Sequence, residues 1–180
     1  PPRAIDAVLV KRPGHDDRWF AGVLSAGFDA VVNERANGMS WPRGKSRYTI
    51  ALLRELATLK PITYRFTLDG VASESPAVLV SVGNNTSIGG GMLVTPDAVL
   101  DDGLLDVLVV RPLSRLEFIR IFPRVFSGTH ITDPRVTIHR VRHLTIDAPD
   151  VVAYADGERV GPLPLEIQIV PAALNVLAPL

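Results

Sequence analysis

Short apolar stretches separated by turn residues run through most of this chain. The first two, residues 4–10 and 19–28, flank the charged segment KRPGHDDR, and this arrangement predicts a hairpin. Residues 62–68 (ITYRFTL) alternate between apolar and polar side chains, as a half-buried strand does. Asp69-Gly70 follows, a dipeptide typical of tight hairpins, and we expect residues 77–82 to supply the returning strand. Further strands are predicted at 104–110, 135–140, 143–148, 151–155 and 165–170.

Helical spacing of apolar residues occurs twice. One predicted helix opens near Ser46 and stops before Pro61, with one apolar face formed by Ile50, Leu53, Leu56 and Ala57. The other follows Ser114, a plausible N-cap, and Pro123 should kink or end it early. The pattern therefore predicts a mainly β (α+β) fold, an antiparallel β-sandwich with two helical excursions.

The composition fits one compact domain over residues 1–180. The chain is 47% hydrophobic, which is enough for a single core. Its 19 basic and 19 acidic residues balance, so no excess positive charge favours nucleic acid or an anionic membrane. No apolar run approaches the roughly 18 residues that a membrane span needs. The opening PPRAID reads as an interdomain linker, so residues 1–5 are expected to be a linker remnant.

Residues 81–107 depart most from the strand pattern. Two asparagines, three successive glycines and four aspartates lie there between apolar stretches. Flexible backbone and short polar side chains suit a loop that approaches a phosphate or a cation closely. A turn without any ligand is the alternative, but Met92, Leu93 and Val94 directly after the glycines favour close approach. No Gly-Lys-Ser/Thr follows, so the loop is not a Walker P-loop.

Three Asp-Gly pairs occur, at residues 69–70, 102–103 and 156–157. For each, the simplest interpretation is a hairpin turn, in which glycine accepts a positive φ and aspartate bonds the local backbone. Glu158 gives the third pair a second carboxylate, and residues two apart on an extended chain point to one face. Asp156 and Glu158 can therefore converge on one point, which suits a general base beside a magnesium-organising group.

Four aspartates fall within the ten residues 97–106. A solvated turn accounts for Asp97 and Asp101. Asp102 is followed by a glycine and a leucine, so a bent backbone could offer carbonyl oxygens beside its carboxylate. Hard cations such as Mg²⁺ or Ca²⁺ bind that mixture of oxygens, and Asp102 is therefore the candidate ligand.

Other reactive side chains do not suggest a site. The chain has no cysteine, which excludes thiolate chemistry. His139 and His143 lie in an alternating strand pattern without a third close ligand, which argues against zinc. Ser25 in LSAGFDA lacks the G-x-S-x-G elbow of a serine hydrolase.

Four motifs, in this order and spacing, resemble the bacterial diacylglycerol and lipid kinases, relatives of the eukaryotic sphingosine and diacylglycerol kinases. They are AGFDA at 26–30, GNNTSIGGGMLVTPDAVLDDGLLDV at 83–107, ADGE at 155–158 and VPAALNVLAP at 170–179. Members of that family begin with a nucleotide-binding domain bearing a GGDGT motif, which nothing in this chain matches. The resemblance therefore implies the second, lipid-side domain of such a kinase, with the N-terminal nucleotide-binding domain absent.

The resemblance also implies a reaction and residues for it. The family transfers the γ-phosphoryl group of ATP to the hydroxyl of a membrane lipid, with magnesium. Asp156 then corresponds to the residue that takes the acceptor's proton, and Glu158 to its acidic neighbour near the catalytic Mg²⁺. Asp102 corresponds to a side-chain ligand of a second, structural Mg²⁺, and Val99 and Leu104 fall where backbone carbonyl ligands would be.

Further contacts are expected from position. The glycine-rich loop should face the cleft and contact phosphate or hydroxyl groups through Asn84, Asn85, Gly89, Gly90 and Gly91. The family's lipid site falls on Gly27, Phe28 and Asp29. The loop with Trp41 and three basic residues is either an interfacial membrane contact or a buried tryptophan beside a solvated turn.

Two other functions stay open: a non-catalytic lipid-binding or regulatory β-sandwich module, and a kinase of the same superfamily with another acceptor, such as a sphingoid base or NAD. Because no ATP-phosphate loop is present, we predict that residues 1–180 alone show no kinase turnover. The expected partners are ATP, a membrane lipid acceptor, the protein's own N-terminal domain and a second copy in a homodimer, with no nucleic acid. The expected location is cytoplasmic, peripheral at the inner membrane surface.

Overall fold

The structure, a computed structural model, describes residues 2–28, 30, 32, 35, 38, 60–88 and 91–177. Within these ranges the chain is built mainly of antiparallel strands. The strands are β1 (Pro2–Arg12), β2 (His15–Phe20), β3 (Val23–Gly27), β4 (Ile62–Leu68), β5 (Val71–Ala77), β6 (Leu79–Gly83), β7 (Leu105–Val110), β8 (Val136–Val141), β9 (His143–Asp147), β10 (Val152–Ala155), β11 (Glu158–Pro162) and β12 (Leu165–Leu177).

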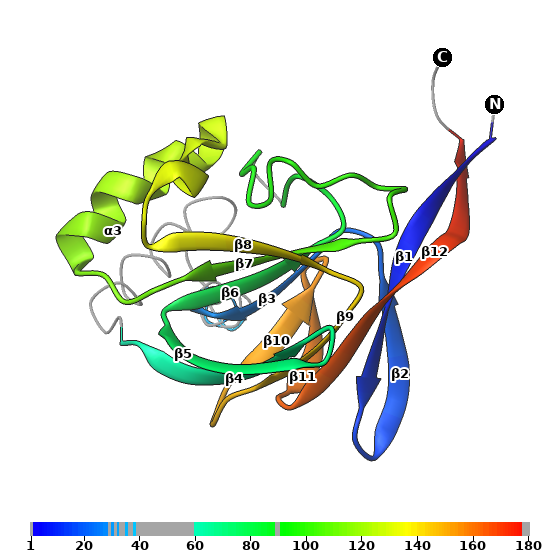
Figure 1. Ribbon diagram of the computed structural model, residues 1–180, viewed down its shortest axis with the longest axis horizontal. Helices are drawn as coiled ribbons and strands as arrows, with labels where there is room; N and C mark the ends of the chain where they lie inside the picture. The colour runs from blue at the N-terminus through cyan, green and yellow to red at the C-terminus, as the bar shows by residue number, and fades with distance from the viewer. Residues whose placement is uncertain are drawn as a thin grey trace.

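The strands form two six-stranded sheets, with the orders β2-β1-β12-β9-β4-β5 and β11-β10-β3-β6-β7-β8. Figure 1 shows them as the two layers of a sandwich, with the β1–β12 pair extending beyond the layers toward both chain ends. The predicted antiparallel β-sandwich is confirmed. In the second sheet, β3 lies between β10 and β6, with Leu24 opposite Ala155 and Val23 opposite Gly83. Segments far apart in sequence therefore meet at one end of this sheet.

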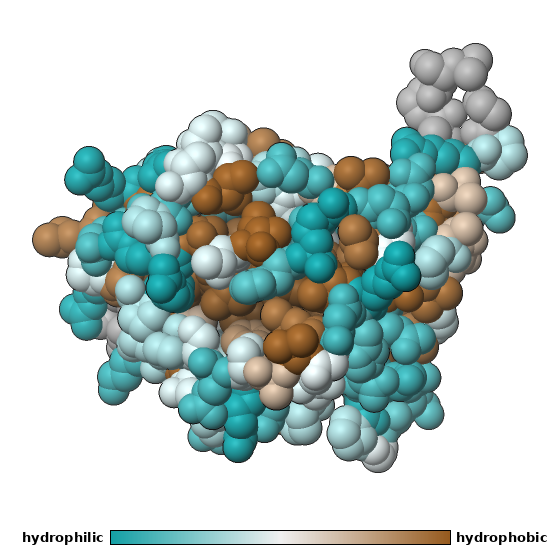
Figure 2. Space-filling view, viewed as in Figure 1, coloured by the Kyte–Doolittle hydropathy of each residue, from teal (hydrophilic) through white to brown (hydrophobic). Residues whose placement is uncertain are grey.

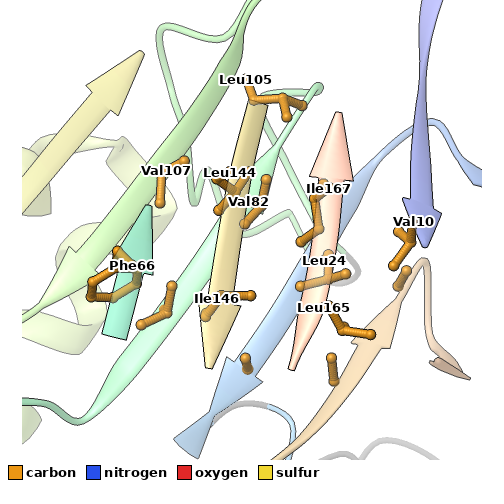
Figure 3. Packing of buried hydrophobic residues seen from close by; sticks show 14 of the residues in the cluster. Val10, Leu24, Phe66, Val82, Leu105, Val107, Leu144, Ile146, Leu165 and Ile167 are labelled. Atoms are coloured by element: carbon orange, nitrogen blue, oxygen red, sulfur yellow. The ribbon is translucent and has the colours of Figure 1, made fainter. Parts of the chain in front are cut away.

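The core lies between the two sheets and explains the alternation seen in the sequence. Its fully buried side chains point inward from both layers, as Figure 3 shows for Ile146 and Ile167 of the first sheet and Leu24 and Val82 of the second. Removing such a side chain from water stabilises the fold by about 1.5–3 kcal/mol each. The period-two pattern therefore fixes which face of each strand points inward.

Two of the predicted strand assignments differ from the structure. The predicted stretch 19–28 breaks after Phe20, because β2 ends in the first sheet and β3 begins at Val23 in the second. After the Asp69-Gly70 turn the returning strand is β5 (VASESPA), whereas most of 77–82 belongs to β6 in the other sheet. The prediction missed β5 because it is a mostly exposed edge strand without an apolar face.

The second predicted helix is α3 (Arg115–Ile121), and its start is as expected. Ser114 caps it: the Ser114 hydroxyl accepts from the Glu117 amide, and the Glu117 carboxylate accepts from the Ser114 amide. Pro123 lies in the 3-10 helix η1 (Phe122–Ser127), which follows α3 directly and is followed by η2 (Thr129–Thr132). The proline thus marks the end of α-helical geometry, as predicted.

The first predicted helix, residues 46–60, and the loop with Trp41 lie almost entirely outside the described residues. In the part of the chain that is described, no helix is both long enough and apolar enough to cross a bilayer.

Candidate functional site

Asp156 and Gly157 form the tight turn that joins β10 to β11. Their φ angles are 49° and 85°, and Ala155 pairs with Glu158 across the turn. Two successive residues with positive φ are typical of a type I′ hairpin turn. Asp156 is therefore not on an extended strand, and the argument that residues two apart share a face does not apply to it.

The Asp156 carboxylate binds the backbone between β2 and β3. Its Oδ2 accepts from the amides of Ala21 (3.1 Å) and Gly22 (3.2 Å), and its Oδ1 accepts from the amide of Val23 (3.0 Å). A carboxylate offers about four lone-pair positions, so one position on Oδ1 stays open to another donor. The side chain is thus held in place while remaining exposed to solvent.

Gly22 makes this contact sterically possible. A Cβ at residue 22 would lie 2.3 Å from Oδ1 of Asp156, far inside van der Waals contact. The chain crosses from one sheet to the other at this glycine, so the break between β2 and β3 and the placement of the carboxylate have one cause.

Asn84 binds the same connection between β2 and β3 from the interior of the protein. Its amide donates to the carbonyl of Gly22 (2.9 Å), and its Nδ2 donates to the carbonyls of Ala21 (3.1 Å) and Asp6 (3.0 Å). Its Oδ1 is buried and accepts no hydrogen bond from any residue that the structure describes. The GNN segment and Asp156 are therefore connected through two backbone residues.

A pocket of about 200 Å³ opens beside Asp156. Glu158 and Arg159 line it from β11, and Arg18 and Trp19 line it from β2. Asp156 and Glu158 thus line the same pocket as two arginines, a residue type that binds phosphate oxygens well. Sequence reasoning missed Arg18, Trp19 and Arg159, because it treated Arg18 as the end of a charged turn and Trp19 as the start of an apolar strand, and gave Arg159 no role.

A second acidic group lies at the same end of the second sheet. Arg140 contacts Oδ2 of Asp102, and its Nε lies 3.6 Å from Oδ1 of Asp106. The Asp102 Oδ1 also accepts from the amide of Leu104 (3.0 Å). Burial raises the pKa of the Asp106 carboxyl, and its buried Oδ2 has no hydrogen-bond partner among the described residues. Asp102 and Asp106 thus share one guanidinium, and one oxygen of Asp106 is left over.

These residues fit Mg²⁺ only if backbone oxygens take part. Among the described residues, no group of three or more histidine, aspartate or glutamate side chains is arranged to hold a metal ion. Carbonyls such as those of Val99 and Leu104 would have to complete the shell around Asp102, and Mg²⁺ accepts such oxygens. The unpartnered Asp106 oxygen beside Asp102 and Arg140 supports a cation at this place.

Asp6 is a structural residue that sequence reasoning missed. It is buried, its Oδ2 accepts from the amide of Gly103 (2.7 Å), and its Oδ1 accepts from the amide of Ala172 (2.8 Å). Its own amide donates to the carbonyl of Leu100 (2.7 Å). Asp6 therefore fixes the aspartate-rich loop against the middle of β12, where the pairing of β1 with β12 is irregular. It lies in the apolar run AIDAVLV, where the only signal was a charge in an otherwise buried strand.

Asn85 and Gly91 of the glycine-rich loop do not line the Asp156 pocket. Asn85 accepts from the amide of Thr86 through Oδ1 (2.6 Å) and does not line that pocket. Gly91, with φ 80°, belongs to a small turn closed by the pairing of Ile88 with Met92. Gly89 and Gly90 lie outside the described residues.

Two of the predicted lipid contacts, Gly27 and Phe28, lie at the opposite end of β3 from Asp156. Gly27 has φ 103°, and a Cβ there would lie 2.6 Å from the hydroxyl of Tyr64, so a side chain is excluded. The Phe28 ring packs on Phe118 of α3, with centroids 4.8 Å apart. Asp29 lies outside the described residues.

Comparison with known proteins gives a consistent result. Residues 22–178 match the family model described as the YegS C-terminal NAD kinase β-sandwich-like domain. The chain is 43% identical over 176 residues to a protein of Mycobacterium tuberculosis (strain CDC 1551 / Oshkosh) named diacylglycerol kinase, covering 97% of this chain and 57% of that protein. It is 31% identical over 168 residues to a protein of Xanthomonas euvesicatoria pv. vesicatoria named "Probable lipid kinase YegS-like", covering 92% and 54%.

A solved structure shares the fold. The crystal structure of a diacylglycerol kinase from Bacillus anthracis superposes with a TM-score of 0.64 at 18% identity, over 97% of this chain and 53% of that one. The chain thus spans about half the length of the curated relatives it matches.

Proposed function

The chain belongs to the family of YegS C-terminal NAD kinase β-sandwich-like domains, and on this premise we propose that it is the substrate-side domain of an ATP-dependent lipid kinase. The acceptor we propose is a lipid hydroxyl such as that of diacylglycerol, the substrate in the name of the Mycobacterium tuberculosis relative. The observation that carries the proposal is the Asp156 carboxylate, which three amides hold in a pocket shared with Glu158 and two arginines.

In the proposed reaction the acceptor hydroxyl donates its hydrogen bond to the open position on Oδ1 of Asp156. As the acceptor oxygen bonds to the γ-phosphorus of ATP, the bond to the β,γ-bridging oxygen breaks, ADP leaves and Asp156 takes the proton. Such transfers depend mainly on positioning and on neutralising charge. The amides of Ala21, Gly22 and Val23 supply the positioning, and we assign the neutralisation of phosphate charge to Arg18 and Arg159, which line the same pocket.

Magnesium is part of the proposal, since it neutralises phosphate charge when bound. Glu158 is the residue we assign to the catalytic ion. Asp102, with the carbonyls of Val99 and Leu104, is assigned to a second, structural ion that orders the aspartate-rich loop. Asn84 acts as a positioning residue, because it fixes the backbone of Ala21 and Gly22, whose amides hold the Asp156 carboxylate.

The ATP-phosphate loop belongs, in this proposal, to an N-terminal domain beyond the 180 residues. The test is transfer of labelled γ-phosphate to diacylglycerol in mixed micelles, by the full-length protein and by residues 1–180 alone. We expect turnover from the full-length protein and none from the isolated domain. Turnover by the isolated domain would contradict the division of labour, and a full-length protein inactive on every lipid alcohol would contradict the kinase proposal.

The structural ion can be tested without activity. At ten times its Kd, a bound ion stabilises a fold by roughly 1.4 kcal/mol. We therefore expect Mg²⁺ to raise the Tm of residues 1–180 by about 3–5 °C. Asp102→Ala should abolish this rise, whereas Asp101→Ala, which removes only an exposed ion pair with Arg3, should keep it. A rise that persists in Asp102→Ala would exclude the assigned site.

A further inference from the structure

The segment formed by α3 and η1 exposes large apolar side chains at one end of the molecule. Leu116 is 80% exposed, Ile119 54% and Phe126 52%. Arg115 and Arg120 are exposed beside them. We call these five residues the α3 surface. In Figure 1 this segment lies at the end of the molecule away from the chain termini, and Figure 2 shows hydrophobic residues standing among hydrophilic ones there.

The helix has two apolar faces, and the core uses only one. Phe118 and Ile121 are buried, and Phe118 stacks with Phe122 at a centroid distance of 5.5 Å. Leu116, Ile119 and Arg120 follow the i, i+3, i+4 spacing of one helix face, which here points outward. Phe126 lies edge-on to Phe122 at 6.1 Å and remains exposed. The outer face is thus apolar although no core requires it.

The charge around this face is positive. The segment 111–132 contains four arginines and one glutamate, within a chain whose formal net charge is zero. The Glu117 carboxylate is already engaged by the Ser114 amide and by Arg135. The side chains of Arg115 and Arg120 make no hydrogen bond or ion pair to any residue in the described part of the chain.

We propose that the α3 surface docks on the anionic face of a lipid bilayer, with Leu116, Ile119 and Phe126 in the headgroup–acyl boundary and Arg115 and Arg120 on lipid phosphates. Arginine pairs bidentately with phosphate, and a helix with leucine and phenylalanine on an outer face beside arginines is suited to lying in an interface. The two arginines are complementary in charge to an anionic bilayer. The surface also lies at one end of the molecule, where a flat bilayer can reach it, and for both reasons we favour a bilayer over a protein.

The function of this membrane contact rests on the proposed function, phosphorylation of a membrane lipid. Binding to the bilayer itself requires no phosphotransfer. The surface follows β7 and lies beyond the Phe28 end of β3, whereas Asp156 lies at the other end. The α3 surface therefore determines how much of the protein is bound to the membrane, and it takes no part in the chemistry at Asp156.

The test is co-sedimentation of the full-length protein with vesicles of phosphatidylcholine, alone or mixed with phosphatidylglycerol. Each arginine near an anionic surface is worth about 1 kcal/mol, so two should raise the partition coefficient by roughly tenfold or more over neutral vesicles. The difference should shrink in high salt. Equal binding to both vesicle types, or no binding to either, would overturn the proposal.

Variants distinguish binding through the α3 surface from non-specific binding to vesicles. Leu116→Ser with Ile119→Ser, and separately Arg115→Ala with Arg120→Ala, should each lower partitioning to the anionic vesicles by about tenfold. Val71→Ser is the matched control, because Val71 is 69% exposed on the edge strand β5, and it should change nothing. Tm values close to wild type verify that each variant is folded.

Two outcomes distinguish this inference from the proposed kinase. A protein that phosphorylates lipid in micelles but does not bind anionic vesicles refutes the α3 surface alone. A protein that binds vesicles through these residues but phosphorylates no lipid refutes the kinase alone. If Leu116→Ser instead dissociates a dimer by light scattering and leaves vesicle binding intact, the surface is an interface between copies and our proposal is wrong.

Discussion

The turns at Asp69-Gly70 and Asp156-Gly157 share one backbone conformation in different surroundings. Their φ angles are 45° and 86° in the first turn and 49° and 85° in the second. Both aspartates accept backbone amides from a distant segment: Asp69 from Arg142 and His143, and Asp156 from the connection between β2 and β3. The dipeptide therefore predicts the turn equally well in both places.

What differs is the set of side chains around each carboxylate. Asp69 ties the β4–β5 turn to the β8–β9 connection and does not line the pocket beside Asp156. Asp156 shares its pocket with Glu158 and two arginines, and it rests on a turn that Asn84 also holds. A turn aspartate thus becomes a candidate base through its neighbours, and the comparison can be tested at both turns.

The largest expected effect is on turnover. Asp156→Asn keeps the side-chain shape and tolerates positive φ but cannot accept the acceptor's proton, so kcat of the full-length protein should fall by at least about a hundredfold. The matched change Asp69→Asn should leave kcat within about twofold of wild type. Steady-state phosphorylation of diacylglycerol measures both. If the two variants lose activity equally, Asp156 is only a turn residue.

A smaller loss is expected from Gly22→Ala. Its Cβ would displace the Asp156 carboxylate, with which it would otherwise overlap at 2.3 Å. A misplacement of this kind should lower kcat by about tenfold or more. The same change introduced into Asp156→Asn should add almost nothing, because the group that it displaces is already inactive. Additive losses would show that Gly22 acts independently of Asp156.

At Asp69 the expected effect is on stability alone. Asp69→Ala removes the acceptor for two amides and puts an alanine at φ 45°, so unfolding free energy should fall by about 1–3 kcal/mol. Urea denaturation measures this loss, and kcat of the folded fraction should stay at the wild-type value. A drop in kcat would mean that the two turns are not functionally separate.

The smallest effect concerns pH and involves neither turn. Burial lowers the pKa of His130, whose Nε2 lies 3.0 Å from the carbonyl of Val94. The folded chain therefore keeps His130 neutral at pH values at which the same residue in the unfolded chain binds a proton. Stability is complete above about pH 6.5 and is lost as pH falls below it, by at most about 1.4 kcal/mol per pH unit. His130→Gln should flatten this part of the curve of Tm against pH; an unchanged slope would assign the effect elsewhere.

Much of the sandwich could be predicted from the chain, because strand alternation and turn dipeptides are local signals. The passage of the chain from one sheet to the other at Gly22 could not be predicted, since it depends on the Asp156 carboxylate, which lies far away in sequence. Edge strand β5 was missed because an exposed strand needs no apolar face. Asp102 and Asp156 were candidates from the residues beside them and received their roles from the motif resemblance, whereas Arg18 and Trp19 reach the pocket only through the pairing of β2 with β1. The balanced total charge also concealed the arginines of α3.

Asp6 gives the terminal strand pair a bearing on the pocket. Its carboxylate grips both the aspartate-rich loop and Ala172, and its carbonyl accepts from the same Asn84 amide group that steadies Ala21. The alignment of β1 with β12 and the position of the proposed base are consequently linked by one series of adjoining hydrogen bonds. A displacement of β1 or β12 at this point should therefore shift the Ala21–Gly22 backbone to which the Asp156 carboxylate is bonded.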